Sequence, residues 1–155
     1  MYIILMRHGD AEPETESVAN RDRRLTPKGM RRVRKSARIL SGFLKGKPAD
    51  IFASPFERTR ETAEIVSAEC AINAWHTAPE LAQSSWPLVA SHLLREGRIT
   101  LLISHQPFLQ RWIMHAGAVI KFDTAAMAVL DYDRPSGRCS LVAYFTPQIK
   151  ELGKD

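Results

Sequence analysis

Three short segments of the sequence carry side chains that can bind or transfer an anion. Arg7-His8-Gly9 follows an apolar run, Arg58 follows Ser54-Pro55, and His105 follows Ser104. Guanidinium groups offer planar, paired donors to phosphate oxygens, and an imidazole can act as a nucleophile or as a hydrogen-bond donor. Together, these residue types indicate a site that binds or transfers an anionic group.

The elements that must position these side chains follow from the apolar pattern. Continuous apolar runs predict buried strands, and amphipathic stretches that begin at capping or proline residues predict helices. The strands expected in the first two thirds of the chain cover residues 2–6, 50–54, 72–76 and 99–104. The expected helices cover residues 27 to about 46, 57–69, 86–96 and 107–117. Residues 10–24 are expected to form a long surface loop, and residues 125–132 and 139–145 a hairpin.

This order of elements predicts an α/β fold. Strands that alternate with helices form a mostly parallel sheet, so we expect a single-domain, three-layer α/β/α sandwich over residues 1–155 that closes with a C-terminal hairpin. In such sheets, ligands bind outside the carboxyl ends of the strands. His8, Arg58 and His105 all follow predicted strands, so we expect them to share one edge of the sheet.

Four segments in order, over nearly the whole chain, resemble the histidine phosphatase (phosphoglycerate mutase-like) superfamily. They are Arg7-His8-Gly9-Asp10, residues 22–29, residues 54–63 and Ile103-Ser104-His105. In its short length the chain resembles the small SixA-type phosphohistidine phosphatases, which lack the helical insertions of larger relatives. The resemblance implies a phosphatase that works through a covalent phosphohistidine intermediate, without a metal or an organic cofactor.

The resemblance also implies roles for individual residues. His8 is the expected nucleophile, with one ring nitrogen unprotonated and the other held by a hydrogen bond, expected to come from the backbone. Arg7, Arg58 and His105 complete the expected phosphate pocket, where nearby guanidinium groups keep His8 neutral. Gly9 allows the backbone to approach the phosphate closely. A metal site at the two histidines is not expected, because the arginines would repel a cation.

The general acid is the part of the pattern that matches least well. Relatives that cleave phosphate esters carry a Glu or Asp in a Leu-x-Glu setting, where this sequence has Gln83. Glu80 is a nearby candidate for the acid. Without an acid, the site would suit a phosphohistidine substrate, whose protonated leaving group departs as neutral imidazole. Arg23 either reaches the rim of the pocket or is a solvated loop arginine. Ser54 either donates to phosphate or bonds to local backbone.

The net charge and the distribution of basic residues indicate which kind of partner the chain can bind. The chain has 155 residues and a net charge of +5, which favours an anionic partner. Nine of the eighteen residues from Arg21 to Arg38 are Lys or Arg. The basic face from Lys28 to Arg38 is either the solvated side of an amphipathic helix or a docking surface for an acidic phosphoprotein. No aromatic residues interleave with it, which makes nucleic acid an unfavoured partner.

The remaining composition is that of an ordinary globular chain. No stretch approaches the ~20 apolar residues of a membrane helix, so we expect a cytoplasmic protein with no membrane contact. Cys70 and Cys139 are expected to be reduced thiols rather than a disulfide or metal ligands.

Three functions follow from these patterns. The first is hydrolysis of phosphohistidine in a signalling or phosphocarrier protein. The second is broad-specificity hydrolysis of small phosphate esters by the same chemistry. The third is a non-catalytic module that binds anions or nucleic acid.

Overall fold

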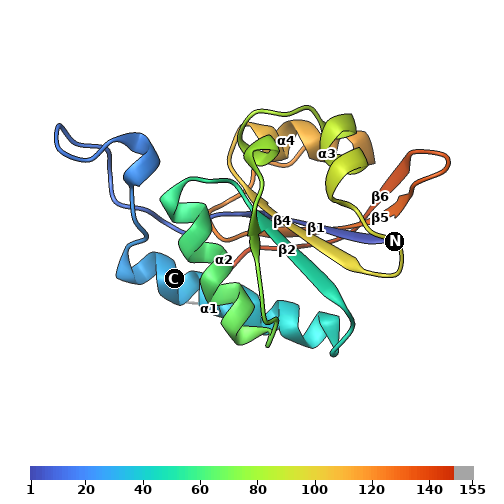
Figure 1. Ribbon diagram of the computed structural model, residues 1–155, viewed down its shortest axis with the longest axis horizontal. Helices are drawn as coiled ribbons and strands as arrows, with labels where there is room; N and C mark the ends of the chain where they lie inside the picture. Colours follow the sequence, from blue (N-terminus) through green and yellow to red (C-terminus); the bar gives the residue numbers. More distant parts are fainter. Residues whose placement is uncertain (149–155) are drawn as a thin grey trace, which may run out of the picture.

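A six-stranded mixed sheet forms the centre of the molecule (Figure 1). The computed structural model describes residues 1–148, so residues 149–155 of the predicted domain lie outside the described residues. The sheet has the order β3-β2-β4-β1-β5-β6. The pairs among β3, β2, β4 and β1 are parallel, whereas β5 pairs antiparallel with β1 and β6 pairs antiparallel with β5. The strands are β1 (Tyr2–Arg7), β2 (Ala49–Ala53), β3 (His76–Thr77), β4 (Ile99–Ser104), β5 (Met127–Asp133) and β6 (Arg138–Phe145).

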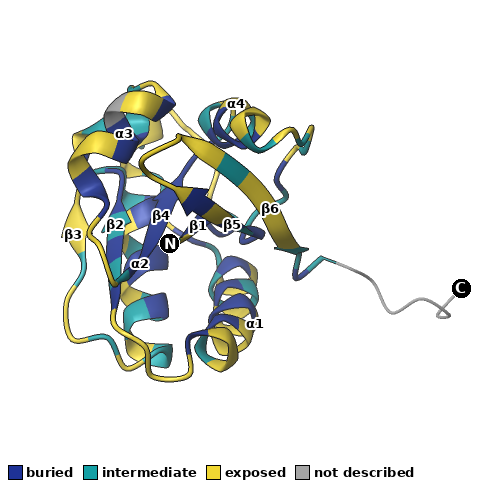
Figure 2. Cartoon of the chain, turned by 90° about the vertical axis from the view of Figure 1, so that its right-hand side faces the viewer, coloured by how far each residue is buried: buried dark blue, intermediate teal, exposed yellow. Residues whose placement is uncertain are grey.

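Helices cover both faces of this sheet. The α-helices are α1 (Pro27–Leu44), α2 (Glu57–Glu69), α3 (Trp86–Leu93) and α4 (Phe108–Ile113). The short 3-10 helices are η1 (Asn20–Asp22), η2 (Pro79–Ala82) and η3 (Met114–Ala116). Figures 1 and 2 show α1 and α2 on one side of the sheet and α3 and α4 on the other. The predicted three-layer α/β/α architecture is confirmed. None of the described helices is long and apolar enough to cross a membrane.

The alternation of side chains along β1 divides the interior into two cores. Ile3 and Leu5 point into the core that α3 and α4 cover, and Ile4 and Met6 point into the core under α1 and α2. All four side chains are fully buried. A strand that is apolar on both faces can lie only in the middle of a layered sheet, which is where β1 lies.

The start of α1 follows from its sequence. The hydroxyl of Thr26 accepts a hydrogen bond from the backbone N–H of Gly29, and Pro27 occupies the first helical position. The helix ends at Leu44, where Lys45 adopts a left-handed conformation with φ of 47°. The predicted helix is therefore confirmed, and it ends about two residues before the predicted end at Gly46.

Three predicted elements are shorter than the sequence pattern indicates. The strand expected over residues 72–76 is only β3, because Ile72 is held against the end of α2 by hydrogen bonds with Ser67. The helix expected over residues 86–96 ends at Leu93, where the chain becomes extended. The helix expected over residues 107–117 tightens from α4 into η3 in its last turn, a common transition at helix ends.

The carboxyl ends of the parallel strands lie level with one another. Arg7 of β1 pairs with Ser104 of β4, and the backbone N–H of His8 donates to the oxygen of Ser104 at 3.2 Å. On the other side of β4, the N–H of Ser54 donates to the oxygen of Ile103 at 3.1 Å. The segments that follow three strands therefore leave the sheet at one edge.

Gly29 allows α1 to contact the segment after β1. A Cβ atom on Gly29 would lie 2.1 Å from the backbone oxygen of Asp10, a distance that no structure tolerates without movement. Gly42 lies in the same helix, and no atom of the described residues lies within 4 Å of the corresponding Cβ position. The two glycines thus differ in packing within one element.

We expect Gly29→Ala to destabilise the protein by roughly 1–3 kcal/mol, because the new methyl group forces α1 away from Asp10. Gly42→Ala should raise stability by about 0.5–1 kcal/mol, because alanine favours the helix. Urea unfolding of both variants measures the two free energies. Equal effects of the two substitutions would contradict the close contact at Gly29.

Candidate functional site

His8 is the first residue after β1, and its side chain is buried at the edge of the sheet. Its Nδ1 lies 2.7 Å from the backbone oxygen of Gly9. Because a carbonyl oxygen only accepts, Nδ1 carries the proton of the neutral ring and donates it. The lone pair of Nε2 then accepts from the Nε–H of Arg58 at 3.3 Å. The expected backbone hydrogen bond to the second ring nitrogen is confirmed.

Arg58 lies in the first turn of α2 and is buried, with 6% of its surface exposed. Its Nη1 donates to the backbone oxygen of Asn20 at 2.7 Å. The side-chain oxygen of Asn20 accepts from Nη1 of Arg23 at 3.1 Å, and Nε of Arg23 donates to the backbone oxygen of Glu12. The loop before α1 thus holds Arg23 beside Arg58, where burial and then the positive charge of Arg23 lower the pKa of Arg58.

Arg7 is the last residue of β1 and lies on the same edge. Its Nη1 donates to the backbone oxygen of Phe122 at 2.8 Å. Its Nε is buried and has no hydrogen-bond partner within residues 1–148. A buried N–H without an acceptor is costly, so this donor favours a ligand with an acceptor oxygen.

His105 follows β4, and its buried ring lies beside the ring of His8. The ring centroids of His8 and His105 are 5.2 Å apart, and the centroid of the Phe56 ring lies 4.8 Å from that of His105. Nε2 of His105 is 2.5 Å from Oγ of Ser54. Nδ1 is buried and, like Nε of Arg7, has no partner in the described part of the chain.

Gly9 supports His8 through its backbone. Its N–H donates to Oγ1 of Thr62 at 3.1 Å, while its carbonyl oxygen accepts from His8. A Cβ atom at this position would lie 2.7 Å from Cγ2 of Val33 in α1. Both backbone groups of Gly9 are therefore occupied, and the glycine orients His8 and admits α1 rather than presenting a free backbone donor.

Burial and positive charge shift the protonation of the site. The pKa of His8 is well below its ordinary value, mainly because burial removes water from the ring, with His105, Arg58 and Arg7 adding to the effect. Burial also lowers the pKa of His105 to about 3, helped by the charges of Arg58, Arg7 and Arg23. Burial lowers the pKa of Arg58 to about 10. Both histidines are therefore neutral at pH 7 and both guanidinium groups are charged.

Glu80 lies in η2, beyond the short strand β3. Its Oε2 is buried without a hydrogen-bond partner among residues 1–148. Within the same residues, no hydrogen bond or ion pair joins it to His8, Arg58 or His105. Its role as general acid stays a prediction, and the Gln83 side chain is exposed at the end of η2.

Two residues that orient the site arginines were not identified from the sequence. Asn20 and Phe122 orient Arg58 and Arg7 through backbone oxygens, which any residue type could supply, so no sequence signal marks them. Ser54 has a signal, since it lies in the segment that resembles the superfamily. Of the two alternatives for Ser54, the structure shows hydrogen bonds within the protein, to His105 and to Thr59.

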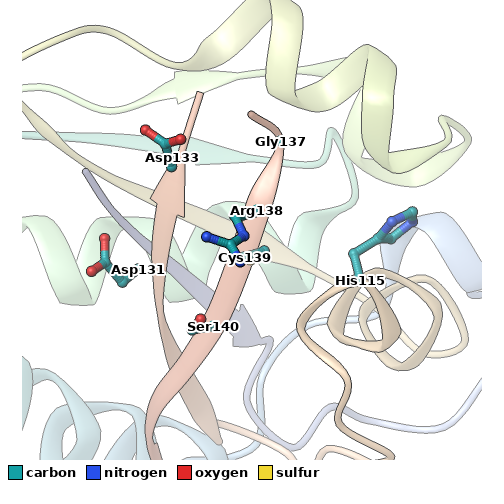
Figure 3. A pocket seen from close by; sticks show the side chains of 7 residues that line it. All are labelled: His115, Asp131, Asp133, Gly137, Arg138, Cys139 and Ser140. Carbon is teal, nitrogen blue, oxygen red and sulfur yellow. The ribbon is translucent and has the colours of Figure 1, made fainter. Parts of the chain in front are cut away.

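A surface hollow lies apart from this cluster. A hollow of about 630 Å³ lies between His115 and the β5–β6 hairpin (Figure 3). One of its lining residues, Asp131, pairs with Tyr2 at the start of β1, so the hollow lies at the opposite end of the sheet from His8. No group of three or more His, Cys, Asp or Glu side chains in the described residues could hold a metal ion.

The basic face of α1 is partly neutralised by neighbouring acids. Within the described chain, the cations from Arg21 to Arg38 form three ion pairs: Arg24 with Glu61, Arg32 with Asp10 and Arg38 with Glu69. Lys28, Arg31 and Lys35 remain exposed. A docking role for this face stays a prediction.

The chain is similar in sequence to one large enzyme family. Residues 3–96 match the sequence profile of the Histidine phosphatase superfamily (branch 1). This match includes Arg7, His8, Gly9 and Arg58. No curated protein sequence matches the chain.

Solved structures share the fold over almost the entire chain. The protein histidine phosphatase SixA, solved with tungstate, is 27% identical, with a TM-score of 0.84, covering 95% of this chain and 97% of its own. A protein from Agrobacterium tumefaciens assigned as a phosphohistidine phosphatase SixA is 21% identical, with a TM-score of 0.75 and coverages of 94% and 97%. A phosphoserine phosphatase variant from Entamoeba histolytica bound to phosphoserine is 14% identical, with a TM-score of 0.67 and coverages of 95% and 98%.

The low pKa of His105 makes stability depend on pH. Between the ordinary value of 6.5 and about 3, the unfolded chain binds a proton that the folded chain does not. Stability therefore falls as the pH drops below 6.5. We expect His105→Asn to remove about 1.4 kcal/mol per pH unit from this slope below pH 6.

Urea unfolding at pH 7, 6, 5 and 4 measures the slope. His92→Asn is the matched control, since His92 is exposed on α3. An unchanged slope in the His105 variant would show that the buried ring does not resist protonation.

Proposed function

We propose that this chain, which belongs to the histidine phosphatase superfamily, hydrolyses phosphohistidine in a protein through a phosphorylated His8. The single observation that carries this proposal is the tautomer of His8. Its Nδ1–H is held by the Gly9 carbonyl, so the lone pair of Nε2 is directed to the side where Arg58 lies. A nucleophile attacks with such a lone pair, and the negative charge of an incoming phosphoryl group is stabilised by a cation such as Arg58.

The reaction then has two steps. Nε2 of His8 attacks phosphorus in line, a new N–P bond forms, and the N–P bond to the substrate imidazole breaks. The leaving imidazole departs neutral when its ring is protonated. Water next attacks the phosphorus on His8, which releases inorganic phosphate and restores the ring. Arg7 and Arg58 stabilise the three phosphoryl oxygens in both steps.

Two arguments favour a phosphohistidine substrate: similarity to a solved phosphatase structure and the residue at the position of the general acid. The chain is 27% identical to a protein histidine phosphatase over nearly the full length of both chains. The position that would hold an acid for ester cleavage is Gln83, which cannot donate a proton to an alkoxide.

The cluster predicts which substitutions abolish turnover. His8→Ala removes the nucleophile and should abolish phosphate release. Arg58→Ala removes charge-assisted donors and should lower kcat/KM by roughly 10²–10³-fold. Arg60→Ala is the control, since Arg60 lies on the same helix but is exposed and paired with Glu57.

Steady-state phosphate release by the three variants tests these expectations. Wild-type turnover in His8→Ala would exclude the covalent mechanism. An equal loss in the two arginine variants would indicate that general charge, rather than the position of Arg58, sets the rate.

Substrate class is tested by a direct comparison. Phosphate release is measured from a phosphorylated histidine-phosphotransfer domain and from an aryl phosphate ester, both with EDTA present. We expect faster release from phosphohistidine, because its leaving group needs no acid from the enzyme. Faster release from the ester would replace the proposal with a broad-specificity ester phosphatase.

A further inference from the structure

Ser54 connects His105 to Thr59 through a buried chain of hydrogen bonds. Oγ of Ser54 lies 2.5 Å from Nε2 of His105 and 2.7 Å from Oγ1 of Thr59. Ser54 and Thr59 are fully buried, and His105 is 5% exposed. Such a chain fixes where each proton lies, because every hydroxyl can donate only one.

The position of the Thr59 proton decides the others. Oγ1 of Thr59 lies 2.8 Å from the backbone oxygen of Ser54 and 2.8 Å from that of Phe56. Both oxygens only accept, so the single hydroxyl proton of Thr59 is directed to them. The contact between the two hydroxyls therefore takes its proton from Ser54. Oγ of Ser54 then accepts from His105, whose Nε2 must carry the proton.

This assignment leaves Nδ1 of His105 with a lone pair. Nδ1 is buried and has no partner in the described part of the chain. The charged or titratable groups near the ring are His8, Arg58, Arg7 and Arg23, which come from the end of β1 and the residue after it, from α2 and from the loop before α1. The rings of His8 and His105 lie 5.2 Å apart, and we infer that an oxygen of an anion bound at His8 contacts Nδ1 of His105. An anionic oxygen and a bare lone pair repel each other.

We propose that Ser54 and Thr59 are positioning residues that hold His105 with its proton on Nε2, so that a phosphoryl group enters the site with one proton between its oxygen and Nδ1 of His105. This inference rests on the proposed function for the identity of the ligand. The proton comes from a P–OH group of the monoanion or from solvent. The resting ring does not supply it, because the pKa of His105 is lowered to about 3.

Thr59→Val should reverse the tautomer. Valine has the shape of threonine without the hydroxyl, so the Ser54 proton loses its acceptor and turns to Nε2 of His105. The proton of the neutral imidazole then moves to Nδ1. Thr59→Ser is the matched control, because it keeps the hydroxyl and should keep the wild-type tautomer.

Nitrogen NMR of protein with ¹⁵N-labelled histidine reads the tautomer directly, because protonated and bare ring nitrogens have distinct shifts. In the resting wild type and in Thr59→Ser, we expect the proton on Nε2 of His105, and in Thr59→Val on Nδ1. A proton on Nδ1 in the resting wild type overturns the proposal, and that spectrum suffices even if Thr59→Val does not fold. Neither result depends on turnover, so a failure of the proposed function remains distinguishable.

Sulfate binding tests the shared proton, because sulfate is a tetrahedral dianion that carries none at neutral pH. In the wild type, sulfate must be accompanied by a proton for Nδ1, so affinity falls about tenfold per pH unit for that proton. In Thr59→Val, the slope of log Kd against pH from 6 to 8 should be smaller by one. Titration calorimetry measures both slopes. Equal slopes in wild type and Thr59→Val would overturn the shared proton, whatever substrate the enzyme uses.

Discussion

The hydrogen bond from the backbone N–H of His8 to the oxygen of Ser104 extends the pairing of β1 and β4 one residue beyond β1. Because the strands are parallel, the residues that follow them emerge on one edge, and the two imidazole rings meet there. The hydrogen bond from the backbone N–H of Ser54 to the oxygen of Ile103 likewise extends the pairing of β2 and β4 by one residue beyond β2. A shift of one residue in β1 would exchange the two faces of the strand and turn His8 away from its partners.

A second constraint is that the site must be basic in charge yet hold unprotonated imidazoles. Burial lowers the pKa of both kinds of group, but the pKa of Arg58 falls only to about 10 from its far higher ordinary value, so Arg58 stays charged while the histidines stay neutral. The loop before α1 completes the arrangement, because Asn20 draws in Arg58 and Arg23 together. The charges that attract an anion are thus the same charges that keep the nitrogens unprotonated.

The sequence predicted the layered fold and the meeting of His8, Arg58 and His105, because apolar runs mark buried strands and the strand ends mark the binding edge. It mispredicted residues 72–76, where a hydrogen-bonded turn at Ser67 outweighs a β-favouring composition. The backbone acceptors at Asn20 and Phe122 could not be predicted, since a carbonyl oxygen leaves no trace in residue type. Ser54 was recognised as polar and well placed, but its partner depends on a distance between two strands.

The Nε–H of Arg7, which has no partner among residues 1–148 and is buried near a second guanidinium group, also affects the stability of the folded chain. Concentrated like charge opposes the compact state, and an anion that binds only the native form offsets it by mass action. At a hundred times its dissociation constant, such a ligand adds about 2.7 kcal/mol. Ambient inorganic phosphate, the product of the proposed reaction, would therefore act as a folding ligand, and the thermodynamic stability of the domain would vary with the phosphate content of its surroundings.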